Sequence, residues 1–220
     1  FHPPIARKLI EEYTDPGETI LDPFCGSGTL AIEAALSKRN ALGTDIDPVA
    51  VFVSRAKTQR VNVSSLERSW KTLREWLDSY RRPDSEYVRR QHDDITHARV
   101  KVVTREEDLW IPQIQNITNW FRNYVLIDLA RILQSIESID IPATHVRFFK
   151  LCFASIIRNA SNADPVPVSG LEVTSHMLKK EKAGRVVNPF TLFARSVKRN
   201  LEAVRDFCEL SSASSCCRFY

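Results

Sequence analysis

The pattern in this sequence best suited to chemistry consists of two acids and two glycines. Each acid follows a short apolar segment, and the two glycines come shortly after the first acid. The stretch from Leu21 to Thr29 reads Leu-Asp-Pro-Phe-Cys-Gly-Ser-Gly-Thr and holds two of the six glycines in the chain. Glycine lets a backbone approach a ligand closely or adopt φ values that a side chain forbids. A helix that begins near Thr29 would direct its unpaired backbone N–H groups at whatever occupies this turn. The stretch therefore indicates a binding loop.

The second acid, Asp45, follows another short apolar segment and lies 17 residues after Gly28. In nucleotide-binding α/β folds an acid roughly 20 residues after the glycine loop binds ribose hydroxyls. Because a carboxylate accepts hydrogen bonds from both vicinal hydroxyls and repels a 2′-phosphate, we expect the ribose of an adenosine. In the alternative interpretation, Asp22 and Asp45 only cap helices and the two glycines only form a tight turn.

The elements predicted around these residues follow the order of half a doubly wound sheet. Apolar residues at helical spacing and runs of apolar residues bounded by turn signals alternate along the first sixty residues. Such a sheet binds its ligand at the carboxyl ends of its strands. The predicted elements are helices over 5–13, 29–38 and 49–60, and strands over 19–21 and 40–44.

These residues resemble a known family. The stretch Asp22 to Thr29 resembles the S-adenosylmethionine (SAM) loop of the DNA methyltransferases that act on adenine N6 or cytosine N4. The segment 43–48, Gly-Thr-Asp-Ile-Asp-Pro, resembles their second cofactor motif, and Phe1-His2-Pro3 resembles the segment that closes over the methionine end of the cofactor. The resemblance covers residues 1–60, about a quarter of the chain.

The resemblance implies an α/β fold with a partial Rossmann-like methyltransferase sheet, SAM as cofactor and DNA as partner. It also implies roles: Asp22 holds the loop and the amino group of the cofactor, Phe24 lines the pocket, and Asp45 binds the ribose. Cys25 is expected to be a small filler rather than a nucleophile. The full predicted cofactor-binding set is Phe1, His2, Pro3, Asp22, Pro23, Phe24, Cys25, Gly26, Ser27, Gly28, Thr29, Asp45, Ile46 and Asp47.

After the predicted SAM-binding half, residues 1–62, the sequence becomes mainly helical. We expect residues 63–210 to be a large helical insertion and residues 211–220 to be either the start of the next core strand or a disordered tail. Apolar residues at three- and four-residue steps predict helices, and their aromatic stripes are interpreted as core. The predicted helices span 66–80, 86–92, 117–136, 143–159 and 191–209, while 93–105 is expected to be irregular with a short strand at 100–103.

The positive charge of the chain is concentrated in its last third. The net charge is +4, and residues 151–220 alone carry ten Lys and Arg against six Asp and Glu, a surplus of four. Four cations close together after a Pro- and Gly-rich loop could lie along a phosphate backbone, although a solvated loop explains them equally well. These candidate DNA-binding residues are Lys179, Lys180, Lys182 and Arg185.

Composition excludes several classes of protein. No apolar run reaches the roughly 20 residues that a membrane span needs. The five cysteines show no CxxC pairing, and the histidines show no paired metal-binding spacing, so neither a metal site nor a disulfide framework is predicted. We therefore expect a reduced, cytoplasmic protein with no membrane or metal partner.

The sequence lacks one motif that the resembled family uses for catalysis. There, Asp/Asn/Ser-Pro-Pro-Tyr/Phe/Trp supplies the acceptor for the amine and the ring against which an extruded base stacks. Asp164-Pro165-Val166-Pro167 lacks the aromatic residue and the paired prolines, and Asn188-Pro189-Phe190 lacks a proline. We therefore expect a fragment that is inactive alone and carries no catalytic residue. Its catalytic strand would lie in a further C-terminal segment or a second chain, and its bare sheet edge would favour a homodimer.

The function expected from these features is SAM-dependent methylation of an exocyclic amino group in DNA, cytosine N4 or adenine N6, in a restriction-modification setting. Two alternatives remain open. One is a guanine-N2 RNA methyltransferase, because residues 25–30 followed by Ile-Glu-Ala-Ala at 32–35 also resemble that group. The other is a catalytically inactive module that binds SAM or DNA.

Overall fold

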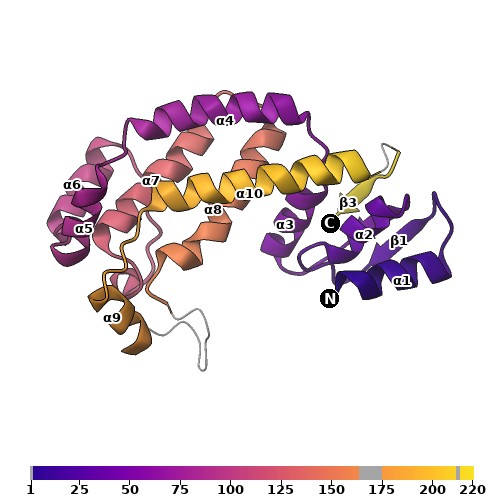
Figure 1. The fold of residues 1–220 in the computed structure, drawn as a ribbon, viewed down its shortest axis with the longest axis horizontal. Coiled ribbons are helices and arrows are strands. Elements are labelled where there is room, and N and C mark those ends of the chain that lie inside the picture. The colour runs from indigo at the N-terminus through magenta and orange to yellow at the C-terminus, as the bar shows by residue number, and fades with distance from the viewer. Residues whose placement is uncertain (1, 164–174, 212–213) are drawn as a thin grey trace. The chain divides into compact units, whose positions relative to one another are not determined.

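The structure is a computed structural model that describes residues 2–163, 175–211 and 214–220. Its residues form two compact units. Unit 1 comprises residues 1–68, 142–151 and 199–220, and unit 2 comprises residues 69–141 and 152–198. Phe1, named in the predicted cofactor set, lies outside the described residues. Figure 1 shows both units with most of their elements labelled.

Unit 1 is built on a parallel sheet of three strands in the order β1-β2-β3. Thr19 pairs with Asn40 between β1 and β2, and Ala41 pairs with Cys217 between β2 and β3. The unit is therefore of the α/β class, and β3, at the far end of the sequence, lies beside β2. Its complete elements are α1 (Pro3–Tyr13), β1 (Thr19–Asp22), α2 (Thr29–Leu36), β2 (Asn40–Gly43), α3 (Pro48–Thr58) and β3 (Cys217–Phe219).

Local signals explain where these helices begin. Proline occupies the first turn of both α1 and α3, where its missing N–H costs nothing. Asp47 caps α3, because its Oδ1 accepts a hydrogen bond from the backbone N–H of Val49 at 2.8 Å. The N-cap of α2 is Gly28 in the left-handed conformation, and no side chain caps this helix.

Small residues let α2 pack closely on the sheet. Ala31 and Ala34 are fully buried against Ala41 of β2 and Phe219 of β3. Gly43 matters at the same place, because a Cβ on it would lie only 2.6 Å from the ring of Phe219. The central strand therefore needs glycine here to admit the aromatic ring of β3.

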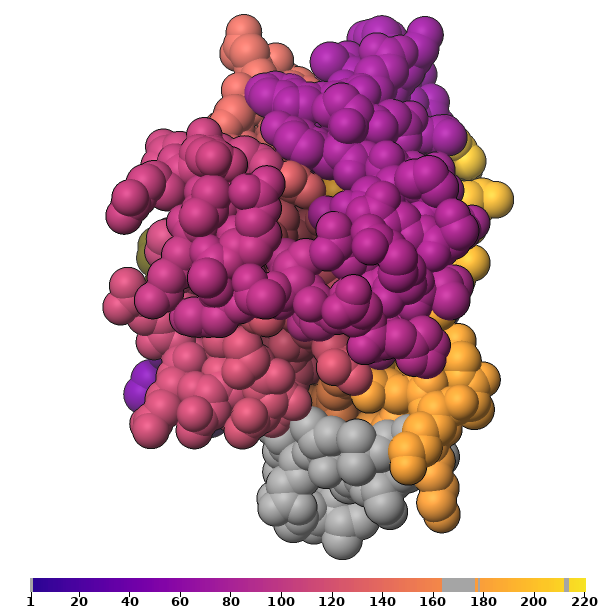
Figure 2. All heavy atoms as spheres, turned by 90° about the vertical axis from the view of Figure 1, so that its left-hand side faces the viewer, coloured from indigo at the N-terminus to yellow at the C-terminus, as the bar shows by residue number. Residues whose placement is uncertain are grey.

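Unit 2 is helical. Figure 2 shows one face of it, on which segments from α4 to α6, coloured purple to magenta, form much of the surface. Three of its helices, α4, α8 and α10, also contain residues of unit 1. The elements are α4 (Val63–Asp78), α5 (Asp84–His92), α6 (His97–Glu106), a 3-10 turn (Ile117–Asn119), α7 (Asn123–Ser138), α8 (Ala143–Ala160), α9 (Ser175–Lys182) and α10 (Pro189–Leu210).

The prediction of an irregular segment with a strand at 100–103 is wrong, because residues 97–106 form α6. Thr96 caps this helix, with its hydroxyl oxygen accepting a hydrogen bond from the N–H of Arg99 at 3.3 Å. Val100 and Val103 are both buried and stand three residues apart. The helical spacing of the buried valines and the threonine cap outweigh the weak preference of valine for strands.

The predicted helix over 117–136 is interrupted. A short 3-10 turn ends at Asn119, and α7 begins only at Asn123. The reason is a cap from a distant residue: the carboxylate of Asp94 accepts hydrogen bonds from the N–H groups of Asn123 at 2.6 Å and Tyr124 at 3.1 Å. The start of α7 is therefore set by tertiary structure.

A buried ionic cluster lies on α7. The Asp128 side chain has no exposed surface, and Arg82 donates to its two oxygens at 2.8 and 2.9 Å. Arg131 approaches the same carboxylate at 3.5 Å. Burial raises the pKa of Asp128 to about 6, although the two arginines act in the opposite direction.

None of the helices in the described parts of the chain combines the length and the apolar character that crossing a membrane requires.

Candidate functional site

The glycine loop joins β1 to α2 and surrounds a hollow at the carboxyl end of β1. Gly26 has a φ of +48° and Gly28 a φ of +76°, values that residues with a side chain rarely adopt. The first N–H groups of α2 face this turn without a side-chain cap. The hollow has a volume of 170 Å³ and is lined by Asp22, Phe24, Cys25, Gly26, Ser27, Thr29 and Leu30.

Gly28 has a second reason to be glycine. A Cβ at this position would lie 2.9 Å from Oγ and 3.1 Å from Cα of Ser54 on α3. Such distances are below ordinary van der Waals contact. The loop and α3 can therefore touch only because residue 28 has no side chain.

Two side chains of α3 donate hydrogen bonds to carbonyl groups of the loop. Ser54 Oγ donates to the carbonyl of Gly26 at 2.9 Å, and Lys57 Nζ donates to the carbonyl of Ser27 at 2.9 Å. Burial lowers the pKa of Lys57. Sequence reasoning did not assign these roles to Ser54 and Lys57. Their three-residue spacing on the helix after the second motif, which puts both on one face, was the available signal.

Asp45 holds the loop with one carboxylate oxygen and the start of α3 with the other. Oδ2 accepts from the N–H of Gly26 at 2.8 Å, and Oδ1 accepts from the N–H of Asp47 at 3.0 Å. Hydrogen bonds from the N–H groups of Asp47 and Gly26 lower the pKa of Asp45. A carboxylate can accept about four hydrogen bonds, so Asp45, which is partly exposed, keeps acceptor capacity for a ligand.

Apolar side chains stand exposed around the loop. Phe24 is 85% exposed, and Ile46, which follows Asp45, is fully exposed. Cys25 is the opposite: it is 4% exposed, and burial raises the pKa of its thiol. A buried, protonated thiol is a poor nucleophile, so Cys25 acts as packing beneath the loop while Phe24 offers an apolar surface.

The remaining predicted cofactor residues are distributed as follows. Asp22 accepts from the N–H of Phe24 at 3.2 Å and so stabilises the turn, and Pro23 accepts from the hydroxyl of Thr44 through its carbonyl. His2 and Pro3 form the start of α1, and neither lines the hollow.

In unit 2, the predicted DNA-binding cations divide into two groups. Lys179, Lys180 and Lys182 are exposed on α9. Glu181 between them accepts from Gln91 at 2.7 Å and from Arg122 at 3.0 Å, which fixes the opposite face of α9.

Arg185 differs from the three lysines because its guanidinium group faces the protein. It donates to Oδ1 of Asn162 at 2.8 Å and to the carbonyls of Asn159 and Ser161 at 2.9 and 2.8 Å. Burial lowers its pKa. Most of the Pro- and Gly-rich loop predicted at 161–170, namely residues 164–170, lies outside the described residues.

Comparison with known proteins gives the loop a context. Residues 3–55 match the family model described as DNA methylase, N6 and N4 methyltransferases. The chain is 28% identical over 163 residues to the type II methyltransferase M.MvaI of Kocuria varians, covering 73% of this chain and 32% of that protein. It is 36% identical over 78 residues to the type II methyltransferase M.BsoBI of Geobacillus stearothermophilus, covering 34% and 15%.

A relative with another name also matches. The ribosomal protein L11 methyltransferase of Cupriavidus taiwanensis is 44% identical over 62 residues, covering 28% of this chain and 21% of that protein. No solved structure matches the chain.

The chain spans a third or less of the length of these relatives. The family match is nonetheless placed on the site, because residues 3–55 contain the glycine loop, Asp45 and Ser54. Through this segment, about a quarter of its length, the chain is similar to the N6/N4 DNA methylase family.

Proposed function

We propose that this chain is the SAM-binding portion of an enzyme that methylates an exocyclic amino group in DNA, either cytosine N4 or adenine N6. One observation carries the proposal. The two-glycine loop, with both glycines at positive φ and Gly26 held by Asp45, lies inside the segment that matches the DNA methylase model. The proposal extends the family match to a cofactor, a substrate and a set of residues.

The residues at the loop suit SAM. Gly26 and the exposed ring of Phe24 line the hollow, and a residue with a side chain would be strained at the φ of +48° that Gly26 adopts. Asp45 keeps acceptor capacity for the ribose hydroxyls, and Ile46 offers an apolar face for the adenine. Asp22 would hold the amino group of the cofactor. Once bound, SAM supplies an electrophilic methyl group.

The protein's part in this chemistry is to position groups and exclude water. Ser54 and Lys57 fix the loop carbonyls, so the loop does not have to be ordered on binding. The exposed Phe24 and Ile46 would lose contact with water when a ligand covers them, and burial of apolar surface favours that step. Cys25 stays neutral and takes no part.

The sheet is proposed to be part of a Rossmann-like methyltransferase sheet. Among the described residues β1 pairs only with β2, so its other edge offers unpaired backbone groups to a further strand. A further segment, a second chain or a second copy could occupy that edge. The division into a SAM-binding half (1–62), a helical insertion (63–210) and a tail (211–220) belongs to this proposal, as does a restriction-modification role.

DNA is the proposed partner of the whole enzyme. Lys179, Lys180 and Lys182 are exposed cations on one helix and suit contacts to a phosphate backbone. The internal hydrogen bonds of Arg185 make it a weaker candidate than the lysines.

A second candidate is methylation of a protein. It is favoured by the 44% identity to a ribosomal protein L11 methyltransferase, which exceeds the identity to M.MvaI. The DNA reading is preferred because the M.MvaI match extends over 73% of this chain, against 28% for the other.

The test combines a binding measurement with a transfer measurement. Calorimetry on this chain should detect SAM binding, and Asp45→Ala should weaken it at least tenfold, since it removes the loop brace and the proposed ribose acceptor. Asp78→Asn, which changes an exposed acid on α4, is the control and should leave binding unchanged. Absence of SAM binding by the folded wild-type chain would contradict the proposal.

Transfer of a labelled methyl group separates the substrates. Duplex DNA, structured RNA and ribosomal protein are offered in parallel to this chain, alone and joined to a methyltransferase segment that carries the missing tetrapeptide. We expect no transfer by the chain alone and transfer to DNA by the joined form. Transfer to RNA would establish the guanine-N2 alternative, and transfer to ribosomal protein would establish the protein alternative. Binding of SAM with no transfer in any form would indicate an inactive module.

A further inference from the structure

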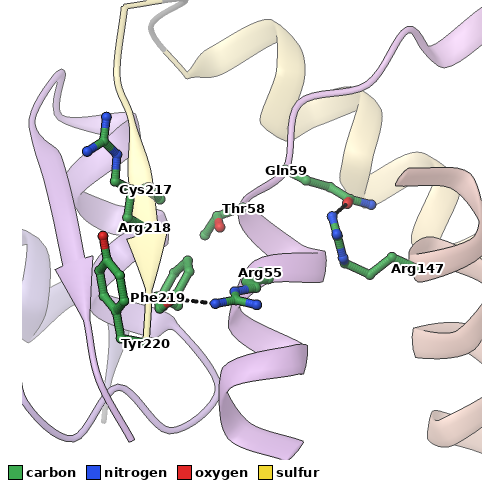
Figure 3. A pocket seen from close by; sticks show the side chains of 8 residues that line it. All are labelled: Arg55, Thr58, Gln59, Arg147, Cys217, Arg218, Phe219 and Tyr220. Carbon is green, nitrogen blue, oxygen red and sulfur yellow. Dashed lines mark hydrogen bonds between the residues drawn. The ribbon is translucent and has the colours of Figure 1, made fainter. Parts of the chain in front are cut away.

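A second cavity of unit 1 lies apart from the glycine loop. It has a volume of 390 Å³ and opens between α3, the first turns of α8 and β3 (Figure 3). It shares no lining residue with the hollow at the loop. Its lining residues are Arg55, Thr58, Gln59, Arg147, Cys217, Arg218, Phe219 and Tyr220.

Two guanidinium groups of this cavity are held by neutral partners. Arg55 Nη2 donates to the carbonyl of Phe219, and Arg147 Nη1 donates to Oε1 of Gln59 at 2.8 Å. Gln59 is itself fixed, because its Nε2 donates to the carbonyl of Thr144 at 2.8 Å. Both arginines are therefore oriented by hydrogen bonds that do not neutralise their charge.

The charge of the cavity is unbalanced. Arg55 and Arg147 contribute two positive charges to it, and its lining contains no aspartate or glutamate. Burial raises the pKa of Cys217 to about 11, so this thiol supplies no negative charge either. A guanidinium carries five N–H donors, and the contacts described use one donor of each group. Two like charges at one hollow repel each other unless an anion lies between them.

We propose that this cavity binds a phosphate group between Arg55 and Arg147. The planar fork of a guanidinium matches the oxygens of a phosphate, and a pair of arginines on two different elements can approach it from two sides. Figure 3 shows Arg55 of α3 reaching toward Phe219 and Arg147 of α8 reaching toward Gln59, and both side chains line the cavity. Arg218 extends from the opposite side of β3 in the same view and is not part of the pair.

The phosphate group could belong to a nucleic-acid backbone or be free in solution. Both sources present tetrahedral oxygens with negative charge, and the experiment separates them. The proposal stands on the geometry of the cavity and does not rest on SAM binding.

The first arm measures free phosphate. Side-chain Nε–H signals of Arg55 and Arg147 are followed by NMR during titration with sodium phosphate, against sodium chloride at equal ionic strength. We expect saturable shifts with phosphate only. Arg147→Gln should abolish the shift of the Arg55 signal, and Arg218→Gln, with the same loss of charge beside the same cavity, should preserve the shifts.

The second arm measures duplex DNA by fluorescence anisotropy at several salt concentrations. Loss of one phosphate contact reduces the slope of log K against log[salt] by about 0.9. We expect this reduction in Arg147→Gln, its recovery in Arg147→Lys, which restores the charge, and an unchanged slope in Arg218→Gln. The backbone amide spectrum of each variant, compared with that of the wild-type chain, is the check that the variant is folded.

The outcomes decide as follows. Phosphate shifts together with a reduced salt slope support a nucleic-acid phosphate as ligand. Phosphate shifts with an unchanged slope support free phosphate. No saturable shift and no change of slope, or equal effects in Arg147→Gln and Arg218→Gln, overturn the proposal. A chain that fails to bind SAM yet shows the phosphate shifts leaves this inference standing while the proposed function fails.

Discussion

At Gly28 two separate constraints meet, a positive φ and close contact with α3. A substitution Gly28→Ala would meet both, because the new Cβ lies 2.9 Å from Ser54 Oγ and the backbone stays at φ +76°. Gly17→Ala is the matched control, since Gly17 has φ +92° and no atom within 4 Å of an added Cβ. The left-handed conformation costs alanine about 1 kcal/mol, and forced contact adds about 1–3 kcal/mol.

Urea unfolding therefore should show a larger loss of stability in Gly28→Ala than in Gly17→Ala, by about 1–3 kcal/mol. Calorimetry should show loss of SAM binding only in the former. Equal destabilisation of the two variants would mean that contact with Ser54 does not constrain residue 28.

The lowered pKa of Asp45 leads to a prediction about pH. Its folded pKa lies below the ordinary value of 3.8 because backbone N–H groups donate to its ionised form. Its contribution to the loop is therefore fully present above about pH 4 and is lost as pH falls through the lowered pKa. The amide signal of Gly26, followed by NMR, should stay constant from pH 7 to pH 4 and move below that. In Asp45→Asn the movement should be absent. A Gly26 signal that titrates above pH 5 would contradict the assignment.

Among the elements, α7 depends on a residue outside itself. Asp94 accepts hydrogen bonds from the N–H groups of Ile95, Asn123 and Tyr124, so Asp94→Ala leaves the first turn of α7 without its cap. Loss of a helix cap costs about 0.5–2 kcal/mol. Asp93→Ala, at the neighbouring exposed position, is the control and should cost almost nothing. Unfolding curves of the two variants that coincide would show that the cap does not stabilise the helix.

The same helix shows where sequence reasoning ends. Elements whose signals are local could be predicted: Pro3 and Pro48 begin α1 and α3, and the two-glycine turn separates β1 from α2. The interruption before α7 could not, because its cap comes from a carboxylate 29 residues earlier in the chain. At the site, the glycines and Asp45 were evident from spacing. The hydrogen bond from Lys57 to the loop could not be predicted, since only the fold brings α3 next to the loop.

At the scale of the whole chain, β2 and β3 join residues that are more than 170 positions apart, and Gly43 is where they fit. A Cβ at residue 43 would lie 2.6 Å from the ring of Phe219. We therefore expect Gly43→Ala to destabilise the chain by about 2–3 kcal/mol through overpacking. Phe219→Leu alone removes buried ring atoms and should also destabilise it.

The double variant tests whether the two residues are coupled. Combined with Phe219→Leu, the alanine at residue 43 gains room, so the double variant should be less destabilised than the sum of the two single variants by about 1 kcal/mol or more. Urea unfolding measures the cycle. Simple additivity of the two effects would show that β3 does not pack on Gly43 in solution.

The protonation of Asp128 should make the stability of the whole chain depend on pH. This carboxylate is fully buried, and burial raises its pKa to about 6, so between about pH 4 and pH 6 the folded state holds a proton that the unfolded state has released. Its contribution to stability therefore falls as pH rises through this window.

Above about pH 6 the ionised Asp128 depends on its ion pair with Arg82. Removing one partner of a buried ion pair costs about 3–5 kcal/mol, so Arg82→Gln should lose about that much at pH 7 and less at pH 5, where Asp128 can be protonated. Arg74→Gln, which breaks an exposed pair with a separation of 3.9 Å, should cost about 0–1 kcal/mol at both pH values. Urea unfolding at the two pH values measures the difference. A loss in Arg82→Gln that is the same at pH 5 and pH 7 would show that the charge on Asp128 is not what Arg82 stabilises.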